Sequence, residues 1–128
     1  MTDRLSPKSP RKQRRFVRNS PQHVHRRMLR CKLDDTLREE YGLRSLNVKK
    51  GDLVRIMRGQ FRDTEGKILA VDYRTIRVYV DGASTTKSDG KEAKVPVHPS
   101  SLMLVKLELN DERRKRIQAR AAKIAESE

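Results

Sequence analysis

The sequence has no tryptophan, one cysteine and only 4% aromatic residues. A single cysteine, Cys31, excludes an internal disulfide, and its basic surroundings fit a small, semi-buried residue better than a reactive thiol. No apolar run is longer than four residues, which excludes a transmembrane helix and the hydrophobic region of a secretory signal. We therefore expect a cytoplasmic protein that has no membrane partner.

Side chains that carry catalysis are scarce as well. The candidates for catalytic or metal-binding groups are His23, His25, His98 and Cys31. They show no recognised catalytic spacing, and structural zinc sites need four ligands, usually in paired sets of Cys or His. The glycines of the chain do not form a nucleotide-binding loop, because none of them is followed directly by Lys and then Ser or Thr. The sequence thus predicts a protein that is not an enzyme and has no cofactor, no metal and no small-molecule substrate.

Core-forming residues are also few and unevenly placed. Leu, Ile, Val and Phe number 29 of 128 residues, and 20 of these lie between residues 43 and 109. A chain of this length holds one domain with tails. We therefore predict a folded unit over residues 43–109, a basic N-terminal arm with short helices over 1–42, and a C-terminal helix over 110–128.

What the sequence has in excess is positive charge, with a net of +14. Residues 1–32 carry 11 Lys and Arg against one Asp, whereas residues 33–128 carry 20 against 16 Asp and Glu. This asymmetry indicates a polyanionic partner, most simply nucleic acid. A solubilising tail, a nuclear localisation signal and a membrane-surface anchor are the alternatives, and the anchor lacks an apolar face.

The first 19 residues alternate cations with Pro and Ser and show no helical or strand periodicity. We expect this segment to be disordered in the free protein and ordered on RNA, because it cannot bury enough apolar surface to offset the ordering entropy. Its Arg and Lys side chains can neutralise phosphates, and Phe16 can stack on an unpaired base.

Two short helices are predicted next. The first has Ser20 as its N-cap and Pro21 at its first position, and its narrow apolar stripe continues to about Lys32. The second covers residues 35–41 and is stopped by Gly42. A third helix over residues 110–128 has Asn110 as N-cap, and its thin apolar stripe of Ile117, Ala121 and Ile124 favours a solvated helix over direct RNA contact.

The central region alternates apolar and polar residues with a period of two, which is typical of half-buried strands. Five strands are expected, over residues 54–56, 68–71, 76–80, 93–97 and 102–109. Pro96 cannot donate to a ladder, so its strand belongs at a sheet edge. Gly82–Gly90 is predicted as a long polar loop with Lys87 at its tip. Short strands with tight connections indicate a mainly β fold, a small SH3-like barrel.

The loop between the first two predicted strands carries the most informative motif. Gly59 and Gly66 give backbone freedom at its ends, while Arg58, Arg62 and Lys67 place positive charge at its rim, which suits a phosphate backbone. The stretch resembles a KOW motif, with Gly66 as the diagnostic glycine. We expect Gly66 to turn the loop back into the strand, and the alternative is that it allows close approach of RNA.

The flanks extend this resemblance over nearly the whole chain. Pro21-x-His23-x-x-Arg26-Arg27, Leu37-Arg38-x-x-Tyr41-Gly42-x-Arg44-Ser45 and the KOW stretch together resemble the archaeal and eukaryotic form of the ribosomal protein family universal L twenty-four, called L twenty-six in eukaryotes. The resemblance implies a ribonucleoprotein component of the large ribosomal subunit that functions in translation. Its implied partners are large-subunit ribosomal RNA and neighbouring ribosomal proteins. His25 and the Arg62-Asp63 pair depart from the family pattern.

The resemblance also implies binding early in assembly, with Gly82–Gly90 close to the polypeptide exit. An alternative function is a KOW-type transcription elongation module that binds RNA polymerase and RNA. The chain has one copy of the motif and no room for the further domains that elongation factors carry. The residues predicted to contact RNA are Arg11, Lys12, Arg14, Arg15, Arg18, His23, Arg26, Arg27, Arg30, Lys32, Arg44, Lys49, Lys50, Arg58, Arg62, Lys67 and Lys87.

Overall fold

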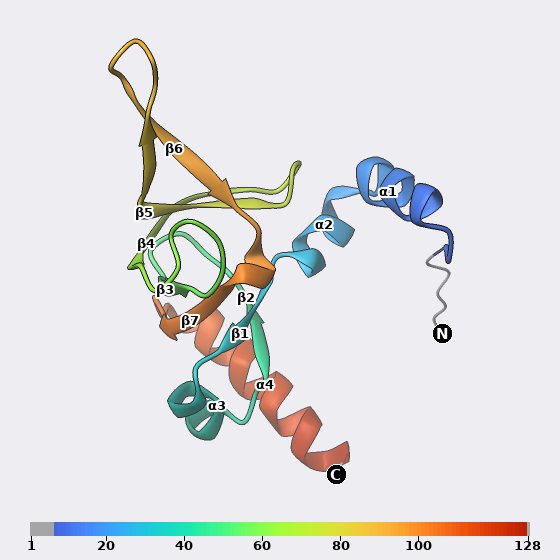
Figure 1. Ribbon diagram of the computed structural model, residues 1–128. Coiled ribbons are helices and arrows are strands. Elements are labelled where there is room, and N and C mark those ends of the chain that lie inside the picture. Colours follow the sequence, from blue (N-terminus) through green and yellow to red (C-terminus); the bar gives the residue numbers. More distant parts are fainter. Residues whose placement is uncertain (1–6, 128) are drawn as a thin grey trace.

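The computed structural model describes residues 7–127 and contains seven strands, four α-helices and one 3-10 helix in that range (Figure 1). The elements are α1 Pro10–Asn19, α2 Gln22–Met28, β1 Arg30–Leu33, α3 Asp35–Tyr41, β2 Ser45–Asn47, β3 Leu53–Ile56, β4 Glu65–Asp72, β5 Arg77–Thr86, β6 Glu92–Val97, η1 Pro99–Ser101, β7 Leu102–Lys106 and α4 Asp111–Ser127. The disorder predicted for residues 1–6 lies outside the described residues.

All seven strands form one curved sheet in the order β2-β1-β7-β3-β4-β5-β6. Only the β1–β7 pair is parallel, and the other neighbours are antiparallel. The sheet closes only partly, as a half-barrel, with α1 and α2 extending to one side and α4 running along the β1–β2 end (Figure 1). This architecture confirms the predicted mainly β, SH3-like fold with N-terminal helices and a C-terminal helix.

The core follows the period-two patterns of the sequence. Val54 and Ile56 of β3, Val78 and Val80 of β5, and Leu104 of β7 are at most 1% exposed, whereas the residues between them are partly accessible. Each apolar side chain that is removed from water contributes about 1.5–3 kcal/mol, so this alternation fixes which face of the sheet points inward.

The sequence predicts neither β1 nor β2, and the helix predicted to continue to about Lys32 is wrong in its last residues. The helix α2 ends at Met28, and Cys31 and Leu33 lie in β1 with both side chains buried. β1 pairs with β2 on one side and β7 on the other. A buried strand of four residues has no periodicity that distinguishes it from a helical turn, so pairing with distant strands decided its conformation.

The arm also differs from the prediction over residues 10–19, where the structure has the helix α1. Pro10 occupies the first helical position, and the segment that follows is rich in Lys, Arg and Gln, which are good helix formers. None of its residues is buried. Intrinsic helix propensity therefore supports α1 more than packing does. The prediction of disorder considered only how much apolar surface the segment could bury.

Ser20 ends a helix instead of beginning one. Its hydroxyl donates to the carbonyl oxygen of Phe16 in the last turn of α1. Pro21 lies at the N-cap of α2, and the first helical residue is Gln22. The predicted roles of Ser20 and Pro21 are thus each displaced by one position, since the α1 helix was not foreseen.

The segment Gly82–Gly90 is not a long loop, because most of it is strand. β5 continues to Thr86, and Ser84 and Thr85 pair with Lys94 and Ala93 of β6. The backbone N–H of Lys87 donates to the carbonyl oxygen of Lys91 at 2.8 Å, so only the tip is a turn. The Ser-Thr-Thr sequence is polar on both faces and its two threonines are β-branched, which suits a solvated two-stranded ribbon. This β5–β6 ribbon projects away from the body (Figure 1).

Other predictions agree with the structure. The helix α3 spans the predicted residues and ends at Gly42, whose φ of 68° is the left-handed conformation that glycine adopts readily. β6, which contains Pro96, is an edge strand. Asn110 caps α4 by accepting a hydrogen bond from the N–H of Arg113 at 2.8 Å. The final strand is shorter than predicted and ends at Lys106.

Candidate nucleic-acid interface

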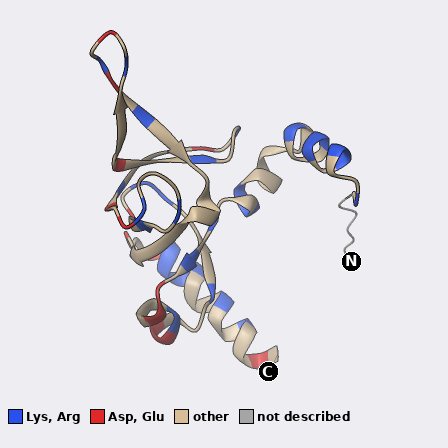
Figure 2. Cartoon of the chain, in the orientation of Figure 1, with Lys and Arg blue, Asp and Glu red and all other residues tan. Residues whose placement is uncertain are grey.

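Sixteen of the seventeen side chains predicted to contact RNA are exposed, and the other, Lys49, is half-buried. Between residues 7 and 33 there is no Asp or Glu, so the two N-terminal helices are purely basic (Figure 2). The acidic residues gather elsewhere, conspicuously on α3 (Figure 2). Thirteen of the predicted side chains lie in an arm over α1 and α2, a cleft beside α4, a loop after β3, and the tip of the β5–β6 ribbon. The other four lie apart from these places, Lys32 in β1, Arg44 before β2, Lys50 before β3 and Lys67 in β4.

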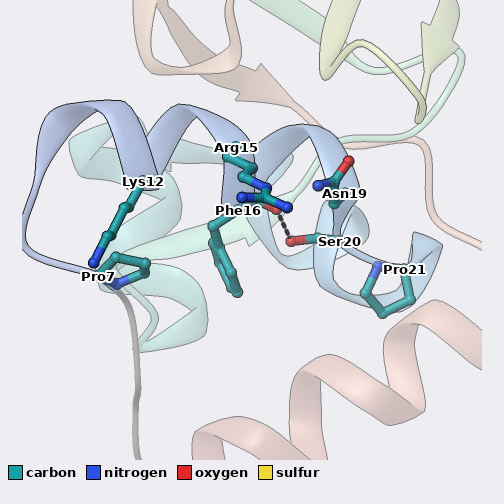
Figure 3. A pocket seen from close by; sticks show the side chains of 7 residues that line it. All are labelled: Pro7, Lys12, Arg15, Phe16, Asn19, Ser20 and Pro21. Carbon is teal, nitrogen blue, oxygen red and sulfur yellow. Dashed lines mark hydrogen bonds between the residues drawn. The ribbon is translucent and has the colours of Figure 1, made fainter.

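On the arm, α1 places an aromatic ring among cations. A groove of about 440 Å³ lies along the helix, and its lining residues are Pro7, Lys12, Arg15, Phe16, Asn19, Ser20 and Pro21 (Figure 3). The Phe16 ring is 40% exposed, which is unusual for a large apolar side chain. An exposed ring with Lys12 and Arg15 beside it can stack on a base while the cations meet the phosphates.

The arm is connected to the sheet through His25, which the sequence did not single out as an RNA contact. Its Nδ1 lies 3.0 Å from the carbonyl oxygen of Tyr73, and its Nε2 lies 2.6 Å from that of Val17. His25 is buried, and the Arg26 guanidinium carbon lies 5.6 Å from the centre of the Tyr73 ring. One short segment therefore joins α1, α2 and the turn between β4 and β5.

The loop between β3 and β4 is held by backbone hydrogen bonds. The Met57 N–H donates to the Ser101 carbonyl oxygen at 2.7 Å, and the Asp63 N–H donates to that of Ile56 at 2.8 Å. Arg58 is exposed. The Nε of Arg62 lies 3.9 Å from Asp63 Oδ2, and both of these side chains are largely exposed to solvent. Such an exposed pair contributes little stability. The guanidinium groups of Arg58 and Arg62 thus lie on an ordered loop and remain accessible to a phosphate.

The prediction that Gly66 turns this loop is wrong, because Gly66 lies inside β4 opposite Val54 and its φ is outside the left-handed region. A Cβ at this position would lie 2.1 Å from the carbonyl oxygen of Asp81 in β5. Real Cβ atoms do not approach an oxygen so closely. The glycine is therefore required for the close contact of two backbones, not for backbone freedom.

The structure brings two predicted cations together with three that the prediction left out. A cleft of about 240 Å³ separates α4 from β1, β2 and the turn after β2. Its lining residues are Arg30, Leu46, Asn47, Lys49, Arg113, Arg116, Ile117 and Arg120. Arg116 and Arg120 flank Ile117, the residue that packs the helix on the core. Arg116 lies one position before Ile117 and Arg120 three positions after it, so both belong to the helix face next to the apolar stripe. This spacing is the sequence signal that could have placed Arg116 and Arg120 beside the sheet.

The helix α4, predicted from its thin apolar stripe to be solvated, is fixed to the sheet by a buried arginine. Arg113 is only 4% exposed, and its guanidinium donates to both carboxylate oxygens of Asp52, at 2.6 and 2.8 Å. It also donates to the carbonyl oxygens of Asn47 and Glu108. Since the charge of Arg113 is neutralised by Asp52, the remaining cations of the cleft define its electrostatic character.

Cys31, which the sequence predicts to be semi-buried, is fully buried in β1. Its thiol donates to the Pro99 carbonyl oxygen at 3.2 Å. Burial, together with the nearby Asp52 charge, raises the pKa of the Cys31 thiol to about 12. Within residues 7–127, no three His, Cys, Asp or Glu side chains are grouped so as to hold a metal ion. No helix in that range has the length and apolar content needed to span a membrane.

Comparison with known proteins decides the family. Residues 7–120 match the family that comprises the eukaryotic ribosomal proteins L26 and their archaeal L24 counterparts. The chain belongs to this family. The match begins in the basic arm and continues through most of α4, so it includes every predicted RNA contact, and it confirms the resemblance inferred from the motifs.

Two curated relatives support the same assignment. The large ribosomal subunit protein uL24 of Methanosphaera stadtmanae is 49% identical over 107 residues, which cover 84% of this chain and 92% of the relative. The protein of the same name from Korarchaeum cryptofilum is 42% identical over 108 residues, which cover 84% and 82%. The family is one of structural ribosomal proteins and not of enzymes, as the sequence predicts.

Proposed function

We propose that this uL24-family protein binds large-subunit ribosomal RNA directly, as a structural constituent of the large subunit in the cytoplasm. Family membership provides the coarse function, a structural protein of the large subunit. The observation that carries direct RNA binding is the exposure of sixteen of the seventeen predicted contacts, together with a run of 27 residues, 7–33, that holds no carboxylate. Such a surface neutralises phosphates and releases counterions.

The mechanism is one of positioning. The arm places Lys, Arg and Phe16 along a segment that projects from the sheet, where it can enter between RNA helices (Figure 2). The ordered β3–β4 loop presents Arg58 and Arg62 to folded RNA, which proteins recognise mainly through shape and backbone. Cations at these places reduce the repulsion between phosphates that the folded RNA brings together.

Finer parts of the proposal follow the family resemblance. The protein acts early in assembly, and the tip of the β5–β6 ribbon with Lys87 lies near the polypeptide exit. The length and projection of the ribbon support a distal contact of this kind (Figure 1). Neighbouring large-subunit proteins are its other partners. The elongation-module alternative receives no support, since the matched family is ribosomal over residues 7–120.

The experiment is copurification of the tagged full-length protein under stringent salt. We expect it in salt-washed large ribosomal subunits, with ultraviolet crosslinks from the arm to ribosomal RNA. Recovery with RNA polymerase instead of large subunits would overturn the proposal. Recovery in large subunits with crosslinks only to proteins would overturn the direct RNA contact while leaving the family function intact.

A further inference from the structure

The cleft between α4 and the β1–β2 end of the sheet is lined by Arg113, whose charge Asp52 neutralises, and by four further cationic side chains. Arg30 comes from β1, Lys49 from the turn after β2, and Arg116 and Arg120 from α4. Among residues 7–127, no carboxylate lies within 4.0 Å of any of these four cationic groups. The acidic residues at the start of α4, Asp111 and Glu112, do not line the cleft.

Two of the cations are held in place by neutral partners. The Nε of Arg30 donates to Asn47 Oδ1 at 3.3 Å, and an Nη of Arg120 donates to the Ser45 carbonyl oxygen at 3.2 Å. These bonds orient the guanidinium groups without neutralising them. Partial burial, and to a lesser degree the charges of Arg120 and Arg27, lower the pKa of Arg30.

The cleft is fixed in shape by its surroundings. The Asp52–Arg113 pair holds α4 to the turn that carries Lys49, and buried Ile117 and Leu46 pack the wall between the cations. The side chains thus converge before any ligand arrives. A bound anion would relieve the electrostatic repulsion between cations that are held close together. A phosphate suits such a site, because one guanidinium group can donate two parallel hydrogen bonds to two phosphate oxygens.

We propose that this cleft, lined by Arg30, Lys49, Arg116 and Arg120, is a phosphate-binding site that takes a backbone phosphate of ribosomal RNA. The inference rests on the proposed function, and it assigns to α4 an RNA contact that the sequence pattern did not favour. Phosphate suits the site because several donors meet at one opening, and the exposed rim allows a polyanion to pass across it.

The test uses two matched double variants of the full-length protein. Lys49→Gln/Arg116→Gln removes one Lys and one Arg from the cleft, and neither side chain makes a hydrogen bond within the described residues. Arg114→Gln/Lys115→Gln removes the same charge types from exposed positions of α4 outside the cleft. Unfolding curves establish that both variants fold like the parent protein.

The first measurement is an NMR titration of the arginine Nε–H signals with pyrophosphate as probe. We expect saturable shifts of Arg30, Arg116 and Arg120 in the parent protein, loss of the Arg30 and Arg120 shifts in the cleft variant, and retention in the control variant. Equal, non-saturating shifts of all arginines would overturn the site, because they would report general screening.

The second measurement is a salt titration of filter binding to large-subunit ribosomal RNA and to an unrelated structured RNA. We expect the cleft variant to bind ribosomal RNA about tenfold more weakly than the control. Its slope of log affinity against log salt should also fall by about 0.7–0.9 for the one phosphate lost. Identical slopes and affinities for the two variants would overturn the inference, even if pyrophosphate binds, and would leave the proposed function standing. A parent protein without preference for ribosomal RNA would overturn the proposed function itself.

Discussion

Asp52 and Arg113 lie 61 positions apart in the sequence and form a buried, two-pronged ion pair with N–O distances of 2.6 and 2.8 Å. The carboxylate also accepts from the backbone N–H groups of Lys49 and Glu108, at 3.0 and 2.9 Å. Four donors fill the acceptor sites of one carboxylate. The pair therefore joins the turn before β3, the connection after β7 and the first turn of α4.

The first prediction concerns this pair. Arg113→Met leaves Asp52 charged and buried without its counter-charge, so we expect the free energy of unfolding to fall by about 3–5 kcal/mol. Urea unfolding of the purified protein measures the change. Arg114→Met is the control, because Arg114 is exposed one position away, and it should alter the stability by about 0.5 kcal/mol or less.

A double variant distinguishes the interaction between Asp52 and Arg113 from the other contacts that each side chain makes. In Asp52→Leu/Arg113→Met both charges are absent, so we expect it to be less destabilised than the sum of the two single variants. The difference is the coupling energy of the pair. An Arg113→Met variant that unfolds like the parent protein would show that the buried pair does not hold α4.

The second prediction is that Gly66→Ala destabilises the sheet. The added Cβ would lie 2.1 Å from the Asp81 carbonyl oxygen, so β4 and β5 must separate, at a cost of about 1–3 kcal/mol or more. Thermal unfolding without RNA measures it. A Gly90→Ala variant serves as comparison, since its Cβ would meet no atom within 4 Å and only the positive φ of 88° opposes it. Equal melting temperatures for Gly66→Ala and the parent protein would refute the close contact.

The third prediction tests how the arm is attached. His25→Ala removes the ring that lies between the carbonyl oxygens of Val17 and Tyr73, so α1 should move independently of the sheet. The heteronuclear NOE values of residues 10–19 should drop while those of β3–β5 stay constant. His23→Ala, an exposed neighbour on α2, should leave both sets unchanged. Equal mobility of α1 in both variants would mean that His25 does not anchor the arm.

The fourth prediction concerns how much of the salt-dependent RNA affinity comes from the cations of α1. The helix α1 carries Arg11, Lys12, Arg14, Arg15 and Arg18. Replacing all five by Gln keeps good helix formers and should lower the slope of log affinity against log salt by up to about 3.5–4.5, if each cation meets one phosphate. Filter binding to large-subunit ribosomal RNA measures the slope. Specificity over unrelated RNA should survive better than affinity, and an unchanged slope would assign the binding to the sheet and α4.

The fifth prediction concerns stacking on the arm. Phe16→Ala should weaken RNA binding by about 1–3 kcal/mol if the ring stacks on one unpaired base. Val17→Ala is a matched control, because Val17 is 38% exposed on the same helix and cannot stack. Both variants are compared by filter binding at one salt concentration. Equal losses would mean that the exposed ring is not a stacking platform.

The sequence alone determined the properties that depend on local pattern and composition. Period-two alternation identified β3, the inner residues of β5 and the edge strand with Pro96, because a strand buried on one face must alternate. The boundaries of α3 followed from its capping residues. The motifs of the chain identified the family, and the charge asymmetry is the sequence property on which the proposed polyanionic partner rests.

Only the tertiary structure decided the rest, since those features depend on contacts between distant residues. Cys31 and Leu33 became strand because β7 and β2 lie on either side of them. Gly66 is needed because another backbone passes at close distance. Arg113 is buried, and Arg116 lines the same cleft as Arg30, because one carboxylate, Asp52, draws α4 against the sheet. A thin apolar stripe predicts a solvated helix until the position of that carboxylate is known.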